Sequence, residues 1–450
     1  MPRHYRYLVG EALAAAFLSA DAWDPSALVT SGALALGARP AWLRRVARTV
    51  IRVFPEPPRD RIHTLARYVA RDSRVAAACT SGEAPRVRRI LDAPPAMGTS
   101  PWPIPPLATL GELGGWLGLA PTALEWIADA RGLERLVRDE ALRHYVYRWV
   151  PKRSGGVRLL EAPKARTKAI QRRILHEILD HVPTHDAVHG FRRGRSIVSH
   201  AAPHAGRDVV MRIDLADFFL SIRATRVRAV FKALGYPEDV AHVLTALATN
   251  RAPGPLMAEA HTLLGPHATH AEIAALRAMA QHARTPHLPQ GAPTSPALAN
   301  LVAYGLDVRL TAAAETVGAR YTRYADDLVF SGDESVAARA RRFAALVAAI
   351  AVDEGFAVNH RKTRIMRRGG RQSVGGLVVN DHPAVPRDRY DQVKAILHNC
   401  VRLGPASQNR EGRPDFRAYV EGLVAWIAGV DPGRREALET SLARIDWNRA

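Results

Sequence analysis

Two adjacent aspartates, Asp326 and Asp327, lie inside an apolar segment and constrain the fold more strongly than any other feature of this sequence. The residue pattern of Tyr321–Ser331 predicts two short strands folded over a turn. Neighbouring carboxylates repel each other, so the pair is costly in a folded segment unless a positive charge neutralises it. Mg²⁺ suits that role, because it binds carboxylate oxygens and keeps positions for substrate phosphates. The alternative, which the pair alone leaves open, is an exposed Asp-Asp hairpin turn.

A third carboxylate, Asp214, ends the apolar run Val209–Ile213, which predicts a buried strand. With Phe218 and Phe219 packed beneath it, this side chain would have a rigid support for binding a metal ion. Alternatively, Asp214 caps a helix that begins at Phe218. Aspartates from separate strands are typical of two-metal phosphoryl transfer, in which ions about 3.5–4 Å apart assist the attacking and the leaving oxygen. Considered together, the carboxylates therefore favour nucleotidyl transfer over either structural alternative.

Between these carboxylates, Leu288–Pro296 contains three prolines and several small residues, which predicts a loop that another chain can approach closely. The strings DLADFF (214–219), QGAPTSP (290–296) and YADD (324–327) resemble, in this order, the palm motifs of reverse transcriptases. The resemblance extends from about Leu107 to the C-terminus. It implies an α+β right-hand polymerase fold with fingers, palm and thumb, preceded by a helical N-terminal extension.

Within the reverse transcriptases, the chain most resembles the bacterial retron type. Two elements of that type are altered: the Asn-Ala-x-x-His element is present as His200–His204, with His in place of Asn, and the RNA-recognising Val-Thr-Gly element as Val374–Gly376, with Gly in place of Thr. Both alterations bear on the RNA partner and not on the polymerase assignment. Arg251–His287 resembles an insertion relative to compact retron enzymes. Four further segments resemble fingers, palm and primer-grip elements: Val157–Pro163, His189–Ile197, Gly355–Thr363 and Gly375–Asn380.

The resemblance implies that Asp214, Asp326 and Asp327 are the catalytic carboxylates and bind Mg²⁺, for which Mn²⁺ could substitute. Phe219 would lie under the sugar 2′ position, where a bulky ring would clash with a ribonucleotide hydroxyl and favour dNTPs. The alternative is that Phe219 is a plain core residue.

Three more residues are expected to bind the incoming dNTP. Arg158 is the candidate for the triphosphate, since a guanidinium matches phosphate oxygens in a bidentate manner. Gln290 would support the nucleotide and the template. Lys362 would either donate a proton to the departing pyrophosphate or neutralise its charge.

Five residues are expected to contact nucleic acid. Arg192, Arg193 and Arg195 would bind the template backbone or the triphosphate, although solvated surface arginines are the alternative. His204 and Gly376 belong to the two altered retron elements. Pairs of histidines four residues apart occur in this region, but zinc would need more ligands, so a structural or RNA-contacting role is favoured.

The overall charge also indicates a polyanionic partner. Basic residues exceed acidic ones by 20, which favours binding to nucleic acid or to an acidic membrane surface. A GC-rich genome would explain arginine in place of lysine, but not the excess of positive charge. The apolar stretches are too short to span a bilayer, Glu11 interrupts any signal-peptide core, and two cysteines exclude a disulfide scaffold. We therefore expect a cytoplasmic protein without membrane contact.

Four consecutive segments are predicted. Residues 1–93 form a helical extension with a net charge of +7, from 15 arginines and eight acids. Residues 94–106, six of them proline, form a linker, because proline fixes the backbone and lacks a donor. Residues 107–385 then contain fingers and palm, and residues 386–450 a helical thumb.

The expected function is RNA-directed DNA polymerisation. In retrons, which the chain resembles, the enzyme copies part of a structured non-coding RNA into DNA, and the product serves in anti-phage defence, with an effector protein as a further partner. The branched RNA–DNA product is primed from an RNA 2′-hydroxyl. The alternatives are a bacterial defence reverse transcriptase without a branched product, and a non-catalytic RNA-binding scaffold that retains the palm.

Overall fold

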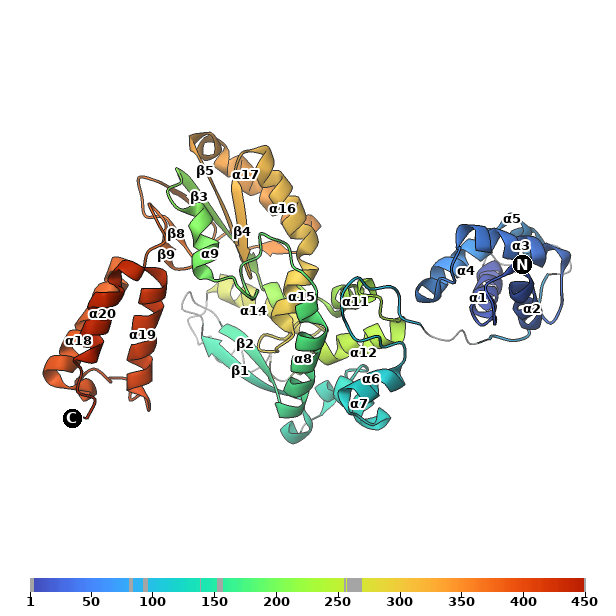
Figure 1. The fold of residues 1–450 in the computed structure, drawn as a ribbon, viewed down its shortest axis with the longest axis horizontal. Helices are drawn as coiled ribbons and strands as arrows, with labels where there is room; N and C mark the ends of the chain where they lie inside the picture. Colours follow the sequence, from blue (N-terminus) through green and yellow to red (C-terminus); the bar gives the residue numbers. More distant parts are fainter. Residues whose placement is uncertain are drawn as a thin grey trace. The chain divides into compact units, whose positions relative to one another are not determined.

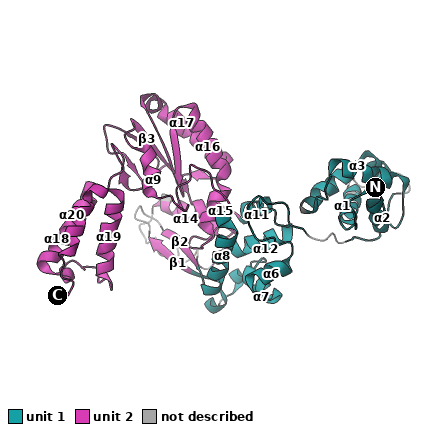
Figure 2. Ribbon diagram, viewed as in Figure 1, with its two compact units in different colours: residues 1–146, 163–181, 224–249 teal, residues 147–162, 182–223, 250–450 magenta. Residues whose placement is uncertain are grey.

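The computed structural model of the chain divides into two compact units that alternate along the sequence (Figure 2). The first unit contains residues 1–146, 163–181 and 224–249, and the second contains residues 147–162, 182–223 and 250–450. The consecutive boundaries at residues 93, 106 and 385 stay predictions. The structure describes residues 4–80, 84–91, 96–137, 139–151, 157–254, 256 and 269–448.

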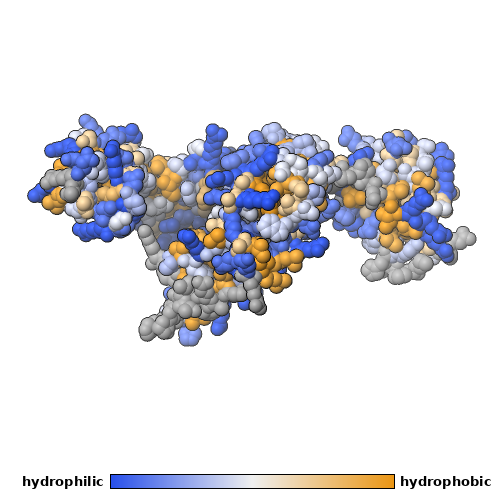
Figure 3. Space-filling view, turned by 90° about the horizontal axis from the view of Figure 1, so that it is seen from below, coloured by the Kyte–Doolittle hydropathy of each residue, from blue (hydrophilic) through white to orange (hydrophobic). Residues whose placement is uncertain are grey.

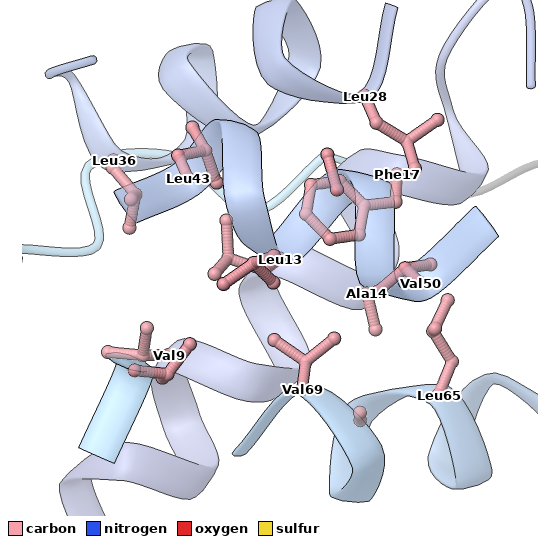
Figure 4. Close-up of a cluster of buried hydrophobic side chains, with 14 of the residues drawn as sticks. Val9, Leu13, Ala14, Phe17, Leu28, Leu36, Leu43, Val50, Leu65 and Val69 are labelled. Carbon is pink, nitrogen blue, oxygen red and sulfur yellow. The ribbon is translucent and has the colours of Figure 1, made fainter. Parts of the chain in front are cut away.

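The N-terminal part of the first unit consists of helices around their own apolar core (Figures 1 and 4). Leu13, Phe17, Leu28 and Leu43 are completely buried in this core. Local signals delimit the helices: Asp24 caps one of them through backbone N–H groups, and Gly37 ends it in a left-handed conformation. These helices are α1 (His4–Leu18), α2 (Pro25–Leu36), α3 (Ala41–Val53), α4 (Ile62–Arg71) and α5 (Ser73–Thr80).

The rest of the first unit is also largely helical. Thr109 and Glu112 form a capping box at the start of α6, and a left-handed Gly118 separates α6 from α7. The buried amide of Gln171 on α8 donates to the Tyr145 hydroxyl (2.8 Å) and to the Leu247 carbonyl on α12 (2.9 Å). Its helices are α6 (Leu110–Leu117), α7 (Pro121–Ala128), α8 (Ala165–Glu177), α11 (Ala224–Ala233) and α12 (Glu238–Ala248), with short 3₁₀ turns at 134–136, 140–142 and 179–181.

The second unit is built on an antiparallel sheet with β3 (Val209–Ala216) in its interior. One side of β3 pairs with β5 (Asp327–Gly332), which in turn pairs with β4 (Arg320–Tyr324). The other side pairs with β7 (Arg364–Arg367) and β6 (Ala357–Val358). The predicted strands are confirmed, but β3 continues two residues past Asp214. Asp214 is therefore not the strand end that the sequence indicated.

Helices α16 (Tyr304–Thr316) and α17 (Glu334–Asp353) pack against this sheet (Figure 1). Every residue of β5 is buried, in agreement with the apolar run Leu328–Phe330 that follows the two aspartates. The remaining elements are α9 (Ile197–Ala201), α10 (Phe218–Ser221), α14 (His270–Ala283), α15 (Ser295–Val302), a 3₁₀ turn at 202–204, and the pair β1 (Tyr145–Pro151) and β2 (Val157–Pro163).

The C-terminal helices share an apolar core with the hairpin of β8 (Ser373–Val374) and β9 (Leu377–Val378). Val393, Leu397, Val420 and Ile427 are its buried helical members. The helices are α18 (Arg387–Leu403), α19 (Phe416–Val430) and α20 (Arg435–Ala443), with 3₁₀ turns at 405–407 and 432–434.

In the surface view of Figure 3, hydrophobic residues form separate patches among hydrophilic ones. Among the residues that the structure describes, no helix combines the length and apolar character needed to cross a membrane.

Candidate active site

The three predicted carboxylates lie on two neighbouring strands of the palm sheet. Asp214 on β3 is the direct partner of Asp327 on β5 in the antiparallel register. Tyr324 pairs with Asp327, so the hairpin turn consists of only Ala325 and Asp326. Ala325 adopts a left-handed backbone conformation with φ of 54°, which is uncommon for a residue other than glycine. This tight turn holds Asp326 beside the other two carboxylates.

Burial makes this cluster electrostatically costly. Asp214 is only 6% exposed to solvent, and Asp327 only 7%. Burial raises the pKa of Asp327 to about 6, and it also raises the pKa of Asp326, with the charge of Asp214 contributing to both shifts. The exposed Asp-Asp turn considered above is therefore wrong for Asp327.

Two basic side chains compensate part of this negative charge. The Arg212 Nε donates to Asp327 Oδ1 at 2.8 Å. The Lys362 Nζ donates to both carboxylate oxygens of Asp214, at 3.1 and 3.2 Å. A backbone bond from the Asn359 N–H to the Asp214 carbonyl, at 2.7 Å, fixes the loop that carries Lys362. Lys362 thus lies at the carboxylates, where a pyrophosphate-neutralising role requires it.

The donor set suits a hard divalent cation. All three acids offer oxygen ligands, and each carboxylate whose pKa is raised by its neighbours would be stabilised by added positive charge. Within the described residues, no three acid, histidine or cysteine side chains already converge as a ready-made metal cage. Arg212 and Lys362 hold positive charge at the cluster instead, so binding of metal ions would require local rearrangement of these contacts.

Arg212 was missed by the sequence analysis. It precedes Asp214 by two residues, and residues two apart on a strand point to the same face. That spacing was the available signal: an arginine on the acidic face of the predicted strand.

An aromatic group adjoins the carboxylate turn. Phe219 is half-buried, and its ring centroid lies 6.3 Å from that of Phe191. Phe191 also lies 6.1 Å from the Tyr324 ring and is 52% exposed. Phe219 therefore belongs to a partly open aromatic surface next to the turn, a location that suits a ring contacting the sugar. Phe191 was not singled out from the sequence, although it lies in the His189–Ile197 segment.

Two of the predicted dNTP-binding residues, Arg158 and Gln290, lie on or beside strand β2. Arg158 is an exposed residue of β2, and its charge lowers the pKa of Asp326, against the larger raising effect of burial. The Glu161 N–H, also on β2, donates to the Gln290 carbonyl at 2.9 Å. Gly291 has φ of 132°, and a Cβ there would lie 2.9 Å from the Glu161 carbonyl oxygen. Only glycine allows this close approach, which places Gln290 beside the strand of Arg158.

A buried ion pair supports the same loop. The Glu161 and His287 side chains are both inaccessible to solvent, and His287 Nε2 lies 2.8 Å from Glu161 Oε2. The Asn250 amide donates to the other carboxylate oxygen at 2.8 Å. Every polar atom of the Glu161 carboxylate thus has a partner, as buried charges require.

A second buried network lies beneath the carboxylate turn. The Arg323 guanidinium, 0% exposed, donates to both oxygens of Asp307 on α16, at 2.7 and 2.6 Å. Its Nη1 also donates to the Asn300 side chain at 3.0 Å and to the Ala325 carbonyl at 3.2 Å. The guanidinium therefore fixes the turn residue that immediately precedes Asp326.

Gly190 connects this network to the fingers motif. The Asn300 amide donates to the Gly190 carbonyl at 3.0 Å. A Cβ on Gly190 would lie 2.7 Å from the Ala325 nitrogen, closer than real Cβ atoms approach other atoms. The His189–Ile197 segment is thus packed directly against the backbone of the carboxylate turn.

His204 lies inside the palm rather than on its surface. Its Nδ1 is 2.7 Å from Ser331 Oγ on β5, and its Nε2 is 2.7 Å from Thr322 Oγ1 on β4. Thr322 Oγ1 is also 2.8 Å from His200 Nδ1, and burial lowers the pKa of His200 to about 3. These neutral histidines join the two strands, so any influence of His204 on RNA binding would be indirect.

The other expected nucleic-acid contacts differ in exposure. Arg193 and Arg195 are exposed, whereas Arg192 is half-buried and donates to the Asp186 carboxylate at 3.2 Å. Gly376 is exposed at the turn of the β8–β9 hairpin with φ of 85°, and a side chain there would meet no atom within 4 Å. Arg193, Arg195 and Gly376 are thus open to a ligand, and their RNA contacts stay predictions.

A family model described as reverse transcriptase (RNA-dependent DNA polymerase) matches residues 150–396, more than half of the chain. The chain is 43% identical over 302 residues to the retron Mx65 reverse transcriptase of Myxococcus xanthus, and the match covers 66% of this chain and 64% of that protein. It is 36% identical over 351 residues to the retron Mx162 reverse transcriptase of the same species, covering 73% and 65%.

A third relative is the retron Ec86 reverse transcriptase of Escherichia coli, with 30% identity over 292 residues, 64% of this chain and 77% of that protein. The chain therefore spans just under two thirds of the length of the two Myxococcus relatives. The matched region contains all three carboxylates, the Gln290 loop and Lys362. The chain thus belongs to the reverse transcriptase (RNA-dependent DNA polymerase) family, in its bacterial retron type.

Proposed function

We propose that this protein is an RNA-directed DNA polymerase that copies part of a structured non-coding RNA into DNA. The observation that carries the proposal is the pairing of Asp214 with Asp327 across neighbouring strands, with Asp326 in the two-residue turn beside them. These three carboxylates would hold divalent metal ions, Mg²⁺ or Mn²⁺. When bound, such ions activate the primer hydroxyl and stabilise the leaving pyrophosphate.

The surrounding side chains have separate tasks in this proposal. Arg158, near enough to Asp326 to lower its pKa, binds the triphosphate of the incoming dNTP. Phe219 lies at the sugar and excludes a 2′-hydroxyl, while Gln290 supports the nucleotide from the loop tied to β2. Lys362, already in contact with Asp214, neutralises or protonates the pyrophosphate as it leaves.

A non-catalytic scaffold is disfavoured by electrostatics. Keeping three acids together in a largely buried cluster raises the pKa of Asp326 and Asp327, which destabilises the ionised protein. A chain that only bound RNA would gain nothing from this cost, whereas a polymerase needs the carboxylates.

The similarity to retron reverse transcriptases extends the proposal to the product. We infer a branched RNA–DNA molecule, primed from an RNA 2′-hydroxyl, that acts with an effector protein in anti-phage defence. The alternative is a defence reverse transcriptase with an unbranched product, favoured by the altered His200–His204 and Val374–Gly376 elements.

Sequencing of the nucleic acid that co-purifies with the protein tests this function. Wild-type protein should carry one RNA together with DNA complementary to part of it, and the DNA should stay linked to an RNA nucleotide until a debranching enzyme is added. The Asp326→Asn variant should carry the RNA without the DNA. RNA without DNA on the wild-type protein supports the scaffold, and DNA free of a branch supports the alternative polymerase.

A further inference from the structure

The N-terminal helical unit presents an unusually basic helix. On α3, Leu43, Val46, Ala47 and Val50 are buried at 0–1% exposure in the core of the unit (Figure 4 labels Leu43 and Val50 in it). The opposite side of the helix carries four exposed arginines, here named the arginine face: Arg44, Arg45, Arg48 and Arg52. The helix thus turns these apolar side chains toward the core and the four arginines away from it.

No acid on α3 itself balances this face. The stretch 36–54 contains no aspartate or glutamate, and among the described residues none of the four arginines forms an ion pair. Arg44 and Arg48, and likewise Arg48 and Arg52, are four residues apart, where like charges destabilise a helix. Replacing some of these arginines by glutamate would stabilise α3, because opposite charges four residues apart attract each other. The repeated arginines are therefore better explained by binding of an external anion than by helix stability.

A second basic segment is fixed to the same helical unit. The N–H groups of Arg88 and Arg89 both donate to the Ala35 carbonyl, at 2.8 and 3.1 Å. The Arg88 side chain packs over Gly37, where a Cβ would lie 2.6 Å from Arg88 Cγ. Arg88 therefore lies at the connection that leads into α3, and this connection carries a further exposed arginine, Arg39. Residues 84–91 likewise contain no acid.

We propose that the arginine face binds the sugar–phosphate backbone of structured nucleic acid, outside the polymerase site. Guanidinium groups bind phosphates in a bidentate manner and stay charged at any physiological pH. Contacts to phosphates position a nucleic acid without reading its sequence, so affinity depends on duplex structure and on salt. The inference rests on the proposed function in that the ligand is the RNA, or RNA–DNA, of this enzyme.

The test compares two charge-matched triple variants of the full-length chain. The first carries Arg44→Glu, Arg48→Glu and Arg52→Glu. The control replaces three exposed arginines of α17 by glutamate, so that the net charge changes equally: Arg339→Glu, Arg341→Glu and Arg342→Glu. Affinity for an RNA duplex and for a DNA duplex of the same sequence is measured over a range of salt concentrations, and circular dichroism reports helix content.

The first variant should bind both duplexes at least about tenfold more weakly at low salt. Its plot of log affinity against log salt should lose a slope of about 2–3, as expected for three lost phosphate contacts. The control should bind within about twofold of wild type. Equal losses in both variants would overturn the arginine face, because net charge alone would then explain binding. No loss in the first variant would overturn it as well, because the duplex would then bind elsewhere.

If the first variant binds only the RNA duplex more weakly, the arginine face is specific for RNA. If it binds both duplexes more weakly, the face contacts the phosphate backbone that RNA and DNA share. If the first variant loses helix content, it is replaced by a triple glutamine variant with Arg44→Gln, Arg48→Gln and Arg52→Gln. A salt slope equal to that of wild type in this glutamine variant would contradict the proposal. Incorporation of dNTPs on a short homopolymer template should be unchanged in the first variant. An inactive wild-type protein would instead refute the proposed polymerase function, and the binding comparison would stand independently.

Discussion

Gly190→Ala is expected to impair catalysis by displacing the carboxylate turn. The added Cβ would lie 2.7 Å from the Ala325 nitrogen and 3.2 Å from two backbone atoms of Tyr324. Ordinary contact begins at 3.4 Å, so one of the two segments has to move by about 0.7 Å, the difference between these distances. Asp326 follows Ala325 directly, so the movement is transmitted to a carboxylate of the proposed active site.

Neither segment can yield without losing hydrogen bonds. The Gly190 carbonyl accepts from Asn300 at 3.0 Å, and the His189 N–H donates to the Arg323 carbonyl at 2.8 Å. On the other side, the Ala325 carbonyl accepts from the buried Arg323 guanidinium. Overpacking of this kind costs about 1–3 kcal/mol of the free energy of unfolding. A misplacement of about 1 Å at a catalytic group costs up to about a hundredfold in rate.

The assay measures single-turnover dNTP incorporation on an RNA template together with urea unfolding. Gly190→Ala should lower the rate by about 10- to 100-fold while the protein stays folded at the assay temperature. Gly369→Ala is the matched control, because a Cβ at that position meets nothing within 4 Å. If Gly190→Ala incorporates nucleotides at the wild-type rate, the turn is not held by this packing and the reasoning fails.

Three further outcomes follow from the site. Phe219→Ala should increase incorporation of ribonucleotides relative to dNTPs, and an unchanged preference in competition assays contradicts the sugar contact. His204→Ala should lower the free energy of unfolding by about 2–4 kcal/mol, because the Ser331 and Thr322 hydroxyls lose a buried partner; unchanged stability would refute the structural role. The pKa of Asp327 is about 6 in the folded protein, against roughly 3.9 in the unfolded chain. Between these two pH values the folded protein therefore binds more protons than the unfolded chain. Metal-free stability should therefore fall as pH rises from about 4 to 6, and urea unfolding of Asp327→Asn should show a smaller decrease than wild type.

Local patterns sufficed for much of the palm. The apolar run before Asp214 and the paired aspartates predicted the two strands and their turn, because strand burial and turn length are set by nearby residues. The continuation of β3 past Asp214 was not predictable in this way, since it depends on pairing with Val358 and Ala357 more than a hundred residues later.

Buried polar partners were the main features that the sequence did not disclose. Arg323 immediately precedes the YADD string (324–327), yet no nearby residue indicates that its side chain is fully buried against Asp307. His204 was expected at RNA because its motif suggested it, whereas its hydrogen bonds join β4 and β5. The partners of these side chains lie on helices and strands that are distant in the sequence. A charged side chain can be buried only with such a partner, so its burial cannot be predicted from neighbouring residues.

Incorporation of dTTP on a poly(rA) template with an oligo(dT) primer, with Mg²⁺, tests the central claim most directly. The wild-type protein should extend the primer, and Asp326→Asn should not, because a neutral amide could not balance the metal ions that these carboxylates are proposed to hold. The variant should keep the wild-type circular dichroism spectrum and whatever RNA affinity the wild-type protein has. Near-wild-type extension by Asp326→Asn, or a folded wild-type protein that does not extend the primer, would contradict the assignment of the carboxylate cluster as a polymerase site.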